Sequence, residues 1–141
     1  MNAGNACLIL GDLYKSWERG DVSGALSYFA ENVVFAVHSA DNGTSLIGNG
    51  MGRDLLGRGL ADCLARFEVR RFELGPVTVR GVWVQSKAGF LYRDRSTGVE
   101  IDGTMRHLWR FVGDEVAHFE LFYDSPRMRA FYDLAAVRAD W

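Results

Sequence analysis

The sequence predicts an α+β fold in which three N-terminal helices cover one face of a strongly curved antiparallel sheet, with a short helix at the C-terminus. Apolar residues recur at helical spacing through most of the first half of the chain. After Phe67 the period changes to two, and four strand-like runs follow one another. Helices segregated to one side of an antiparallel sheet are typical of α+β proteins. The length of 141 residues suits one domain, over residues 1–141.

The helices are predicted from apolar stripes and their end signals. A first helix over about Asn5 to Arg19 has one stripe, made by Ala6, Ile9, Leu13 and Trp17. Gly20 ends this helix, and Asp21 can cap a short second segment whose apolar face includes Phe29. A third helix follows over about Arg53 to Phe67, although Gly57 and Gly59 are unfavourable for it.

The strands are predicted from β-branched and aromatic runs between turn residues. A first strand covers Val33 to Ser39, and a polar loop follows it over Ala40 to Gly52. Gly75 and Pro76 interrupt the first of the later runs, which indicates a bend. Ser125 and Pro126 are suited to open the final helix. The four later runs are Glu68 to Val79, Val82 to Arg93, Val99 to Phe111 and Val116 to Tyr123.

Composition excludes several classes of function. The net charge is −2 and no basic block occurs, so we expect no nucleic-acid partner. Cys7 and Cys63 lie in apolar helical patterns, which favours free thiols in a reducing compartment. No basic leader and no bilayer-length apolar run is present, which predicts a cytoplasmic protein with no membrane partner. Three scattered histidines and no phosphate-binding loop predict neither a metal nor another cofactor.

Four short motifs, in this order of elements, carry a family resemblance over nearly the whole chain. They are Trp17–Asp21 (WERGD), Phe29–Val33 (FAENV), His107–Phe111 (HLWRF) and Phe122–Asp124 (FYD). The chain resembles the nuclear transport factor 2-like superfamily, and within it the SnoaL-like group related to polyketide cyclases and ketosteroid isomerases. The resemblance implies a cone-shaped fold, an internal pocket, and a homodimer packed through the sheet.

The resemblance also points to positions where related enzymes place acids and bases. The general base of ketosteroid isomerases falls on Val37, and His38 beside it should point to the opposite face. The isomerase oxyanion pair falls on Leu13, with Tyr14 adjacent, and on His107. No complete isomerase set is therefore present.

The epoxide hydrolase-like members of the superfamily give the same result. Their third-strand residues fall on Lys87 and Gly89, and their last acid falls on Leu121, with Glu120 one residue away. A one-residue slip in register would exchange these neighbours between the two faces of the sheet.

His107 is the candidate for chemistry. It shares a predicted strand face with Gly103, Met105, Trp109 and Phe111, which are apolar. Three interpretations are open for this side chain. It is a core histidine bonded to Tyr123 or to a backbone carbonyl, a ligand contact, or a general acid or base.

The other candidates are expected to shape a ligand site. Lys87 could hold an anionic or carbonyl group if it points inward, but a lysine on an exposed sheet face is the favoured interpretation. Tyr123, on one face with Phe119 and Leu121, could donate to a ligand oxygen or simply pack. Trp17 and Trp109 would form a flat apolar wall, or equally a part of the core. The predicted ligand-binding set is Leu13, Tyr14, Trp17, Val37, Lys87, Met105, Trp109, Leu121 and Tyr123.

These observations favour a small-molecule-binding protein with an apolar or aromatic ligand and His107 at the pocket floor. An enzyme of this kind would carry out cofactor-free isomerisation, cyclisation or dehydration by proton transfer. The alternative is a non-catalytic association domain whose pocket is filled by its own side chains. In either case we expect a homodimer, and the candidates for its apolar surface are Trp83, Leu91, Leu108 and Phe122.

Overall fold

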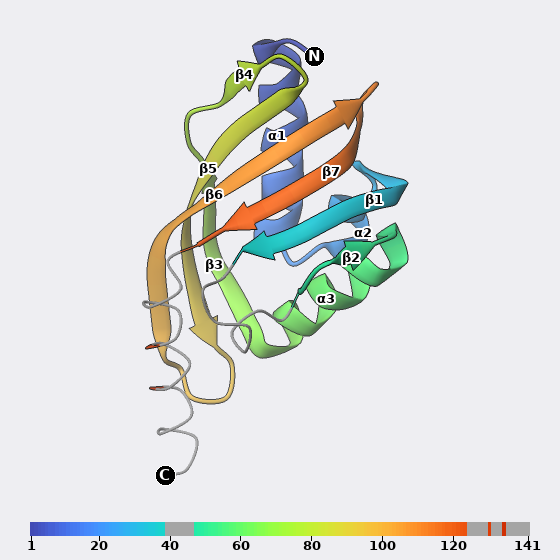
Figure 1. Ribbon diagram of the computed structural model, residues 1–141. Coiled ribbons are helices and arrows are strands. Elements are labelled where there is room, and N and C mark those ends of the chain that lie inside the picture. The colour runs from blue at the N-terminus through green and yellow to red at the C-terminus, as the bar shows by residue number, and fades with distance from the viewer. Residues whose placement is uncertain (39–46, 124–129, 131–133, 135–141) are drawn as a thin grey trace.

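The computed structural model describes residues 1–38, 47–123, 130 and 134. It confirms the predicted α+β fold with an unclosed, curved sheet (Figure 1). The elements follow in the order α1 (Ala3–Glu18), α2 (Val22–Leu26), β1 (Phe29–His38), β2 (Gly50–Met51), α3 (Arg53–Arg66), β3 (Phe67–Leu74), β4 (Thr78–Arg80), β5 (Trp83–Asp94), β6 (Glu100–Val112) and β7 (Glu115–Phe122).

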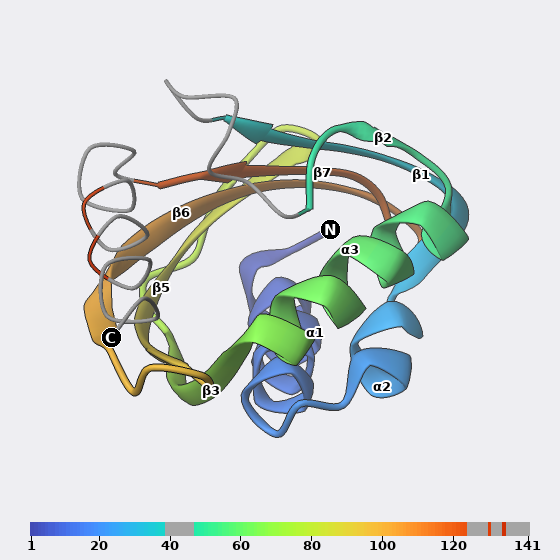
Figure 2. The same cartoon turned by 90° about the horizontal axis from the view of Figure 1, so that it is seen from below.

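The strands form one sheet in the order β2-β1-β7-β6-β5-β3, with β4 also pairing with β5. The pairing is antiparallel except between β1 and β7, which run parallel. Figure 2 shows the sheet curving around the space that α1 and α3 occupy. The helices therefore cover the inner, concave face, and the outer face has no helix among the described residues.

Three predicted boundaries were wrong. β1 begins at Phe29 instead of Val33, because Phe29 pairs with Val116 and a bulge separates it from Val34. The end of the predicted polar loop forms the short strand β2, which pairs with β1. The run broken by Gly75 and Pro76 is two strands, β3 and β4, and not one bent strand. The predicted start of the C-terminal helix, at Ser125 and Pro126, lies outside the described residues.

The apolar face of α1 is rotated relative to the predicted stripe. Leu10 is fully buried, whereas Ile9 is only half-buried. The buried face therefore also includes Tyr14, whose side chain is 2% exposed. This rotation turns the Tyr14 ring toward the sheet, where it packs edge-on against Phe72 with ring centres 4.9 Å apart.

Polar side chains hold α1 against the strands. Trp17 Nε1 donates to the hydroxyl of Tyr92 on β5 over 2.9 Å, and Glu18 Oε2 accepts from the backbone N–H of Phe72 on β3 over 2.8 Å. At the C-terminal end of the helix, Gly20 adopts φ 73° and Asp21 caps α2 by accepting from the N–H of Gly24. These bonds fix the rotation of α1 over the inner face.

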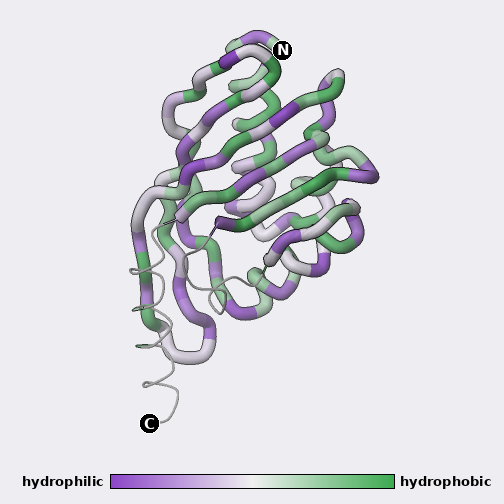
Figure 3. Tube along the Cα trace, viewed as in Figure 1, coloured by the Kyte–Doolittle hydropathy of each residue, from purple (hydrophilic) through white to green (hydrophobic). Residues whose placement is uncertain are grey.

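Alternation along the long strands separates the two faces of the sheet. Hydrophobic and hydrophilic positions alternate along the strands in Figure 3. The inward positions of β5 form the set Val84, Ser86, Ala88, Phe90 and Tyr92, all buried. The polar or charged side chains buried within the described residues are Ser16, Ser86, Asp94 and His107.

The two glycines that disfavoured the third helix are explained by close packing. A Cβ on Gly57 would lie 2.7 Å from a methyl of Leu26, and one on Gly59 would lie 3.0 Å from Ile47 Cα. Helix α3 thus approaches α2 and the backbone of Ile47 through its glycines. This approach brings Ile47 to the space between the helix and the sheet.

We predict that Gly59→Ala lowers the free energy of unfolding by about 1–3 kcal/mol, because backbone atoms of Ile47 cannot move away as a side chain can. The matched control is Gly11→Ala in α1, whose Cβ would meet nothing within 4 Å. This control should raise the free energy of unfolding by about 0.5–1 kcal/mol, the helix propensity gain of alanine over glycine. Urea denaturation measures both, and equal effects of the same sign would contradict the packing explanation.

Candidate functional site

A cavity of about 90 Å³ lies between the helices and the inner face of the sheet. Its lining is almost entirely apolar and aromatic. It includes residues from α1, α3 and the inward faces of the strands, such as Leu13, Leu60, Phe72, Met105 and Phe119. The side chains of the described residues therefore leave part of the interior unfilled.

The structure brings nine of the ten predicted site residues together around this cavity. Their roles as ligand contacts stay predictions, but their placement is clear. They are Leu13, Tyr14, Trp17, Val37, Met105, His107, Trp109, Leu121 and Tyr123.

Lys87 is the exception: it lies on an exposed sheet face, the favoured interpretation from the sequence, so it does not meet the condition for a ligand contact. Its side chain is exposed on the outer face, beside Arg106 of the paired strand. The physical reason is strand alternation, since the neighbours Ser86 and Ala88 are buried inward. Lys87 lines a separate, open hollow on the outer face and not the cavity.

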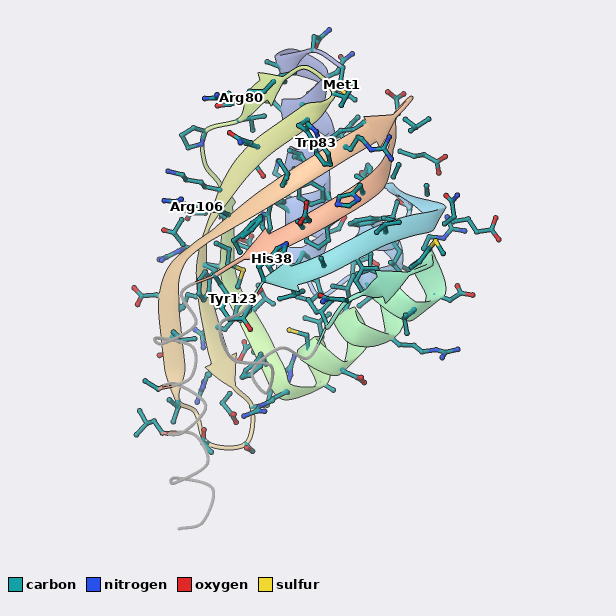
Figure 4. The ribbon with its side chains drawn as sticks, viewed as in Figure 1. Met1, His38, Arg80, Trp83, Arg106 and Tyr123 are labelled. Carbon is teal, nitrogen blue, oxygen red and sulfur yellow. The ribbon has the colours of Figure 1, made fainter. Side chains whose placement is uncertain are left out.

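The strand register determines which residue of each neighbouring pair, on β1 and on β7, faces inward. Val37 lies opposite Leu121 and both line the cavity. On the outer face His38 Nε2 contacts Glu120 Oε1 at 2.5 Å, and Figure 4 shows His38 on the side of the sheet opposite α1. The bond from His38, with the contribution of His118, holds the pKa of the Glu120 carboxyl below its usual value. The acid nearest to the expected catalytic position is thus outside the cavity.

Sequence reasoning missed Ser86 and Cys63. Ser86 is 3% exposed, and alternation from the buried Val84 and Ala88 would have found it. Cys63 lines the cavity from α3, and burial raises the pKa of its thiol to about 12. A neutral thiol is a poor nucleophile, so Cys63 contributes packing to the site.

The polar groups of the site form one hydrogen-bonded chain at the floor of the cavity. Trp109 Nε1 donates to Ser86 Oγ over 2.8 Å, and Ser86 Oγ lies 2.7 Å from the Tyr14 hydroxyl. The Tyr14 hydroxyl is in turn hydrogen-bonded to His107 Nδ1. The partner of His107 is therefore Tyr14, and the expected bond to Tyr123 or to a backbone carbonyl was wrong.

Burial keeps both titratable members of the chain neutral. Desolvation lowers the pKa of His107 to about 3 and raises the pKa of the Tyr14 phenol well above its usual value. The imidazole is surrounded by the rings of Tyr14, Phe72, Trp109 and Phe119, with centres 5.4 to 6.0 Å away. At neutral pH His107 is an uncharged imidazole in an aromatic enclosure.

The second nitrogen of His107 has no hydrogen-bond partner among the described residues. Nδ1 is bonded to Tyr14, so the second nitrogen is Nε2. Within the described part of the chain, no fully buried side-chain nitrogen or oxygen lacks a partner. Nε2 is therefore not sealed by protein atoms, and His107 lines the cavity. A ligand in this space would meet a mainly apolar wall in which His107 Nε2 is available for a hydrogen bond.

The described residues contain no group of three or more His, Cys, Asp or Glu side chains arranged to hold a metal ion. In the same part of the chain, no helix combines the length and the apolar character needed to cross a bilayer.

Comparison with known proteins identifies the family. The model of the SnoaL-like domain matches residues 10–119. The chain belongs to the SnoaL-like family. No curated protein matches the sequence.

Solved structures share the fold of this SnoaL-like domain at low sequence identity. A Bacillus subtilis protein provisionally named an isomerase is 14% identical, with a TM-score of 0.83 over 94% of this chain and 96% of its own. A hypothetical protein with a ketosteroid isomerase-like fold from Catenulispora acidiphila, solved in complex with trimethylamine, is 18% identical, with a TM-score of 0.74 over 94% of this chain and 95% of its own. A Xanthomonas campestris protein provisionally named a polyketide cyclase is 13% identical, with a TM-score of 0.71 over 91% and 99%.

We predict that His107 makes the SnoaL-like domain less stable as the pH falls below about 6.5. Its pKa is about 3 in the folded state and near 6.5 in the unfolded chain, so between these values the unfolded state binds the extra proton. The stability that comes from keeping His107 neutral is fully present above its pKa in the unfolded chain. Below that pKa, the free energy of unfolding falls by about 1.4 kcal/mol per pH unit.

Urea denaturation of the protein and of His107→Phe, between about pH 6.5 and about pH 5, measures this slope. The difference between the two free energies of unfolding should change with pH, because phenylalanine does not titrate. Parallel pH profiles would show that His107 is not buried as a neutral imidazole.

Proposed function

We propose that this SnoaL-like domain binds a small, mainly apolar molecule in its internal cavity, with His107 as the polar contact. The observation that carries the proposal is a cavity with a mainly apolar and aromatic lining that includes His107, whose Nε2 has no hydrogen-bond partner among the described residues. Ligand sites commonly combine apolar walls with a few polar groups that orient the ligand.

The volume limits the size of the ligand. Typical sites for drug-sized ligands measure roughly 300–1,000 Å³, whereas this cavity measures about 90 Å³. An engineered apolar cavity of about 150 Å³ in another protein binds benzene. The cavity as it stands suits a molecule of at most one ring, and a polycyclic ligand would need the surrounding side chains to move.

The same cavity could also be the active site of an enzyme, which is a more specific version of this proposal. The two neighbours provisionally named an isomerase and a polyketide cyclase suggest cofactor-free isomerisation, cyclisation or dehydration. None of the described residues that line the cavity is Asp, Glu, Lys or Arg. Any chemistry here would therefore depend on polar groups such as His107 and Tyr14.

We predict that a library of single-ring compounds contains ligands that cause saturable chemical-shift changes at cavity residues. Val37→Phe should abolish these changes, because Val37 lines the cavity and a larger ring there would fill it. Val34→Phe is the matched control, since Val34 lies on the same strand but is 40% exposed on the other face. Finding no ligand, or finding that binding survives Val37→Phe, would overturn the proposal.

We also propose that the domain forms a homodimer through the outer face of the sheet. Trp83, Leu91 and Leu108 are half-buried, and Phe122 is 37% exposed. Figure 4 shows Trp83, His38 and Arg106 on this face. The ring of His38 stacks on Phe122 with centres 4.4 Å apart. Aromatic side chains without a covering helix favour association with a second copy.

We predict that Phe122→Asp converts this dimer to a monomer, because an unpaired carboxylate would be buried at its centre. Leu8→Asp is the control, since Leu8 is 70% exposed on α1, away from the sheet face. Light scattering after gel filtration gives the mass of each. A wild-type monomer, or a dimer that survives Phe122→Asp, would contradict the proposal.

A further inference from the structure

We propose that the chain of hydrogen bonds from Trp109 through Ser86 and Tyr14 to His107 has one direction, so that His107 presents Nε2–H to the cavity. The ligand would then be a molecule with a hydrogen-bond acceptor, of the class of small ketones, aldehydes and esters. This inference rests on the proposed function, because it names the ligand class of the same cavity.

The direction begins at Trp109. An indole nitrogen is a donor only, so the 2.8 Å contact from Trp109 Nε1 makes Ser86 Oγ an acceptor. The hydroxyl of Ser86 keeps one proton to donate. Its other partner is the Tyr14 hydroxyl at 2.7 Å, and the Ser86 hydroxyl makes no further hydrogen bond among the described residues.

The Ser86 proton therefore goes to Tyr14, and the Tyr14 proton goes to His107. Tyr14 Oη accepts from Ser86 and has one proton left, for which His107 Nδ1 is the acceptor. In the reverse direction His107 would donate to Tyr14, and Tyr14 to Ser86. The buried hydroxyl proton of Ser86 would then have no acceptor among its recorded contacts, which is unfavourable in an apolar interior.

The state of His107 follows from the acceptor role of Nδ1. A neutral imidazole carries one ring proton, and with Nδ1 accepting, that proton is on Nε2. Desolvation keeps the ring neutral, since it lowers the pKa of His107 to about 3. The nitrogen that lies open to the cavity is thus a donor without a partner among the described residues.

The donor character of His107 Nε2–H determines which ligands would bind best in the cavity. A carbonyl oxygen can accept a hydrogen bond from this N–H, which then polarises the carbonyl group. Neutral imidazoles polarise substrate carbonyls in this way in some enzymes. A ligand that offers only a donor would bring two N–H or O–H groups together, and a pure hydrocarbon would leave Nε2–H unpaired. In this state His107 has no free lone pair, so it acts as a hydrogen-bond donor and not as a general base.

The direction is tested first on the protein without ligand. Nitrogen-15 NMR of histidine-labelled protein distinguishes the two neutral tautomers, and the signals of His107 are assigned by their loss in His107→Phe. We expect the proton on Nε2 at neutral pH. A proton on Nδ1, or a charged ring, would overturn the inference without reference to any ligand.

The ligand class is tested with three small rings of similar size. Cyclopentanone offers an acceptor, methylenecyclopentane replaces its oxygen by a CH₂ group, and pyrrole offers a donor only. We expect the affinity ratio of cyclopentanone to methylenecyclopentane to be about tenfold higher in the wild type than in His107→Phe, the effect of one hydrogen bond. Pyrrole should bind the wild type no better than it binds the variant.

Val112→Phe is the control, because Val112 lies on the same strand but is 62% exposed and does not line the cavity. It should keep the wild-type ratio. If His107→Phe does not fold, the wild-type preference for cyclopentanone over pyrrole decides the ligand class. Stronger binding of pyrrole would overturn the inference while leaving a ligand site, whereas no binding of any ring would overturn the proposed function as well.

Discussion

The buried bond between the Tyr14 hydroxyl and His107 is the contact on which the site depends. It joins α1 to β6, and through Ser86 and Trp109 the same chain reaches β5. Ser86 and His107 are 72 and 93 positions from Tyr14 in sequence, so these bonds form only when the helix lies correctly on the sheet. Large rings cannot interdigitate fully where a flat helix face meets a curved sheet. The space that remains is the cavity, and its floor is the hydrogen-bonded chain.

Strand alternation then decides what chemistry the cavity contains. Along β1 and β7 the register places Val37 and Leu121 inside and His38 and Glu120 outside. A slip of one residue would bring a carboxylate and an imidazole into the cavity and expose two apolar side chains instead. The burial of the apolar set therefore stabilises this register. The same preference removes the acids that related enzymes are known to use, and leaves hydrogen-bonding groups such as His107 Nε2 in an apolar space.

The sequence was sufficient for the fold and for the strand and α1 positions of the predicted site, whereas the cavity residues contributed by α3, such as Leu56 and Leu60, were not predicted. Boundaries failed where pairing overrides local pattern, as at Phe29, which starts β1 by pairing with Val116. Lys87 entered the predicted ligand-binding set from a family position, whereas alternation buries its neighbour Ser86 and leaves Lys87 on the exposed face. The hydrogen-bond partner of His107 could not be predicted from the sequence, for a different reason. It depends on the rotation of α1, which is set by contacts from Trp17 and Glu18 to distant strands.

The cost of the polar chain favours a role in binding over a role in folding. A core of Leu and Phe at these positions would avoid the desolvation that lowers the pKa of His107 and raises that of Tyr14. A polar network kept only for structural specificity would also be expected to satisfy every member internally. This one satisfies Trp109, Ser86 and Tyr14 but leaves Nε2 of His107 without a partner among the described residues, at the wall of the cavity. Departures of this kind from packing rules concentrate at functional sites. The open nitrogen is thus the feature that a purely structural explanation does not account for, and a ligand acceptor would complete the chain.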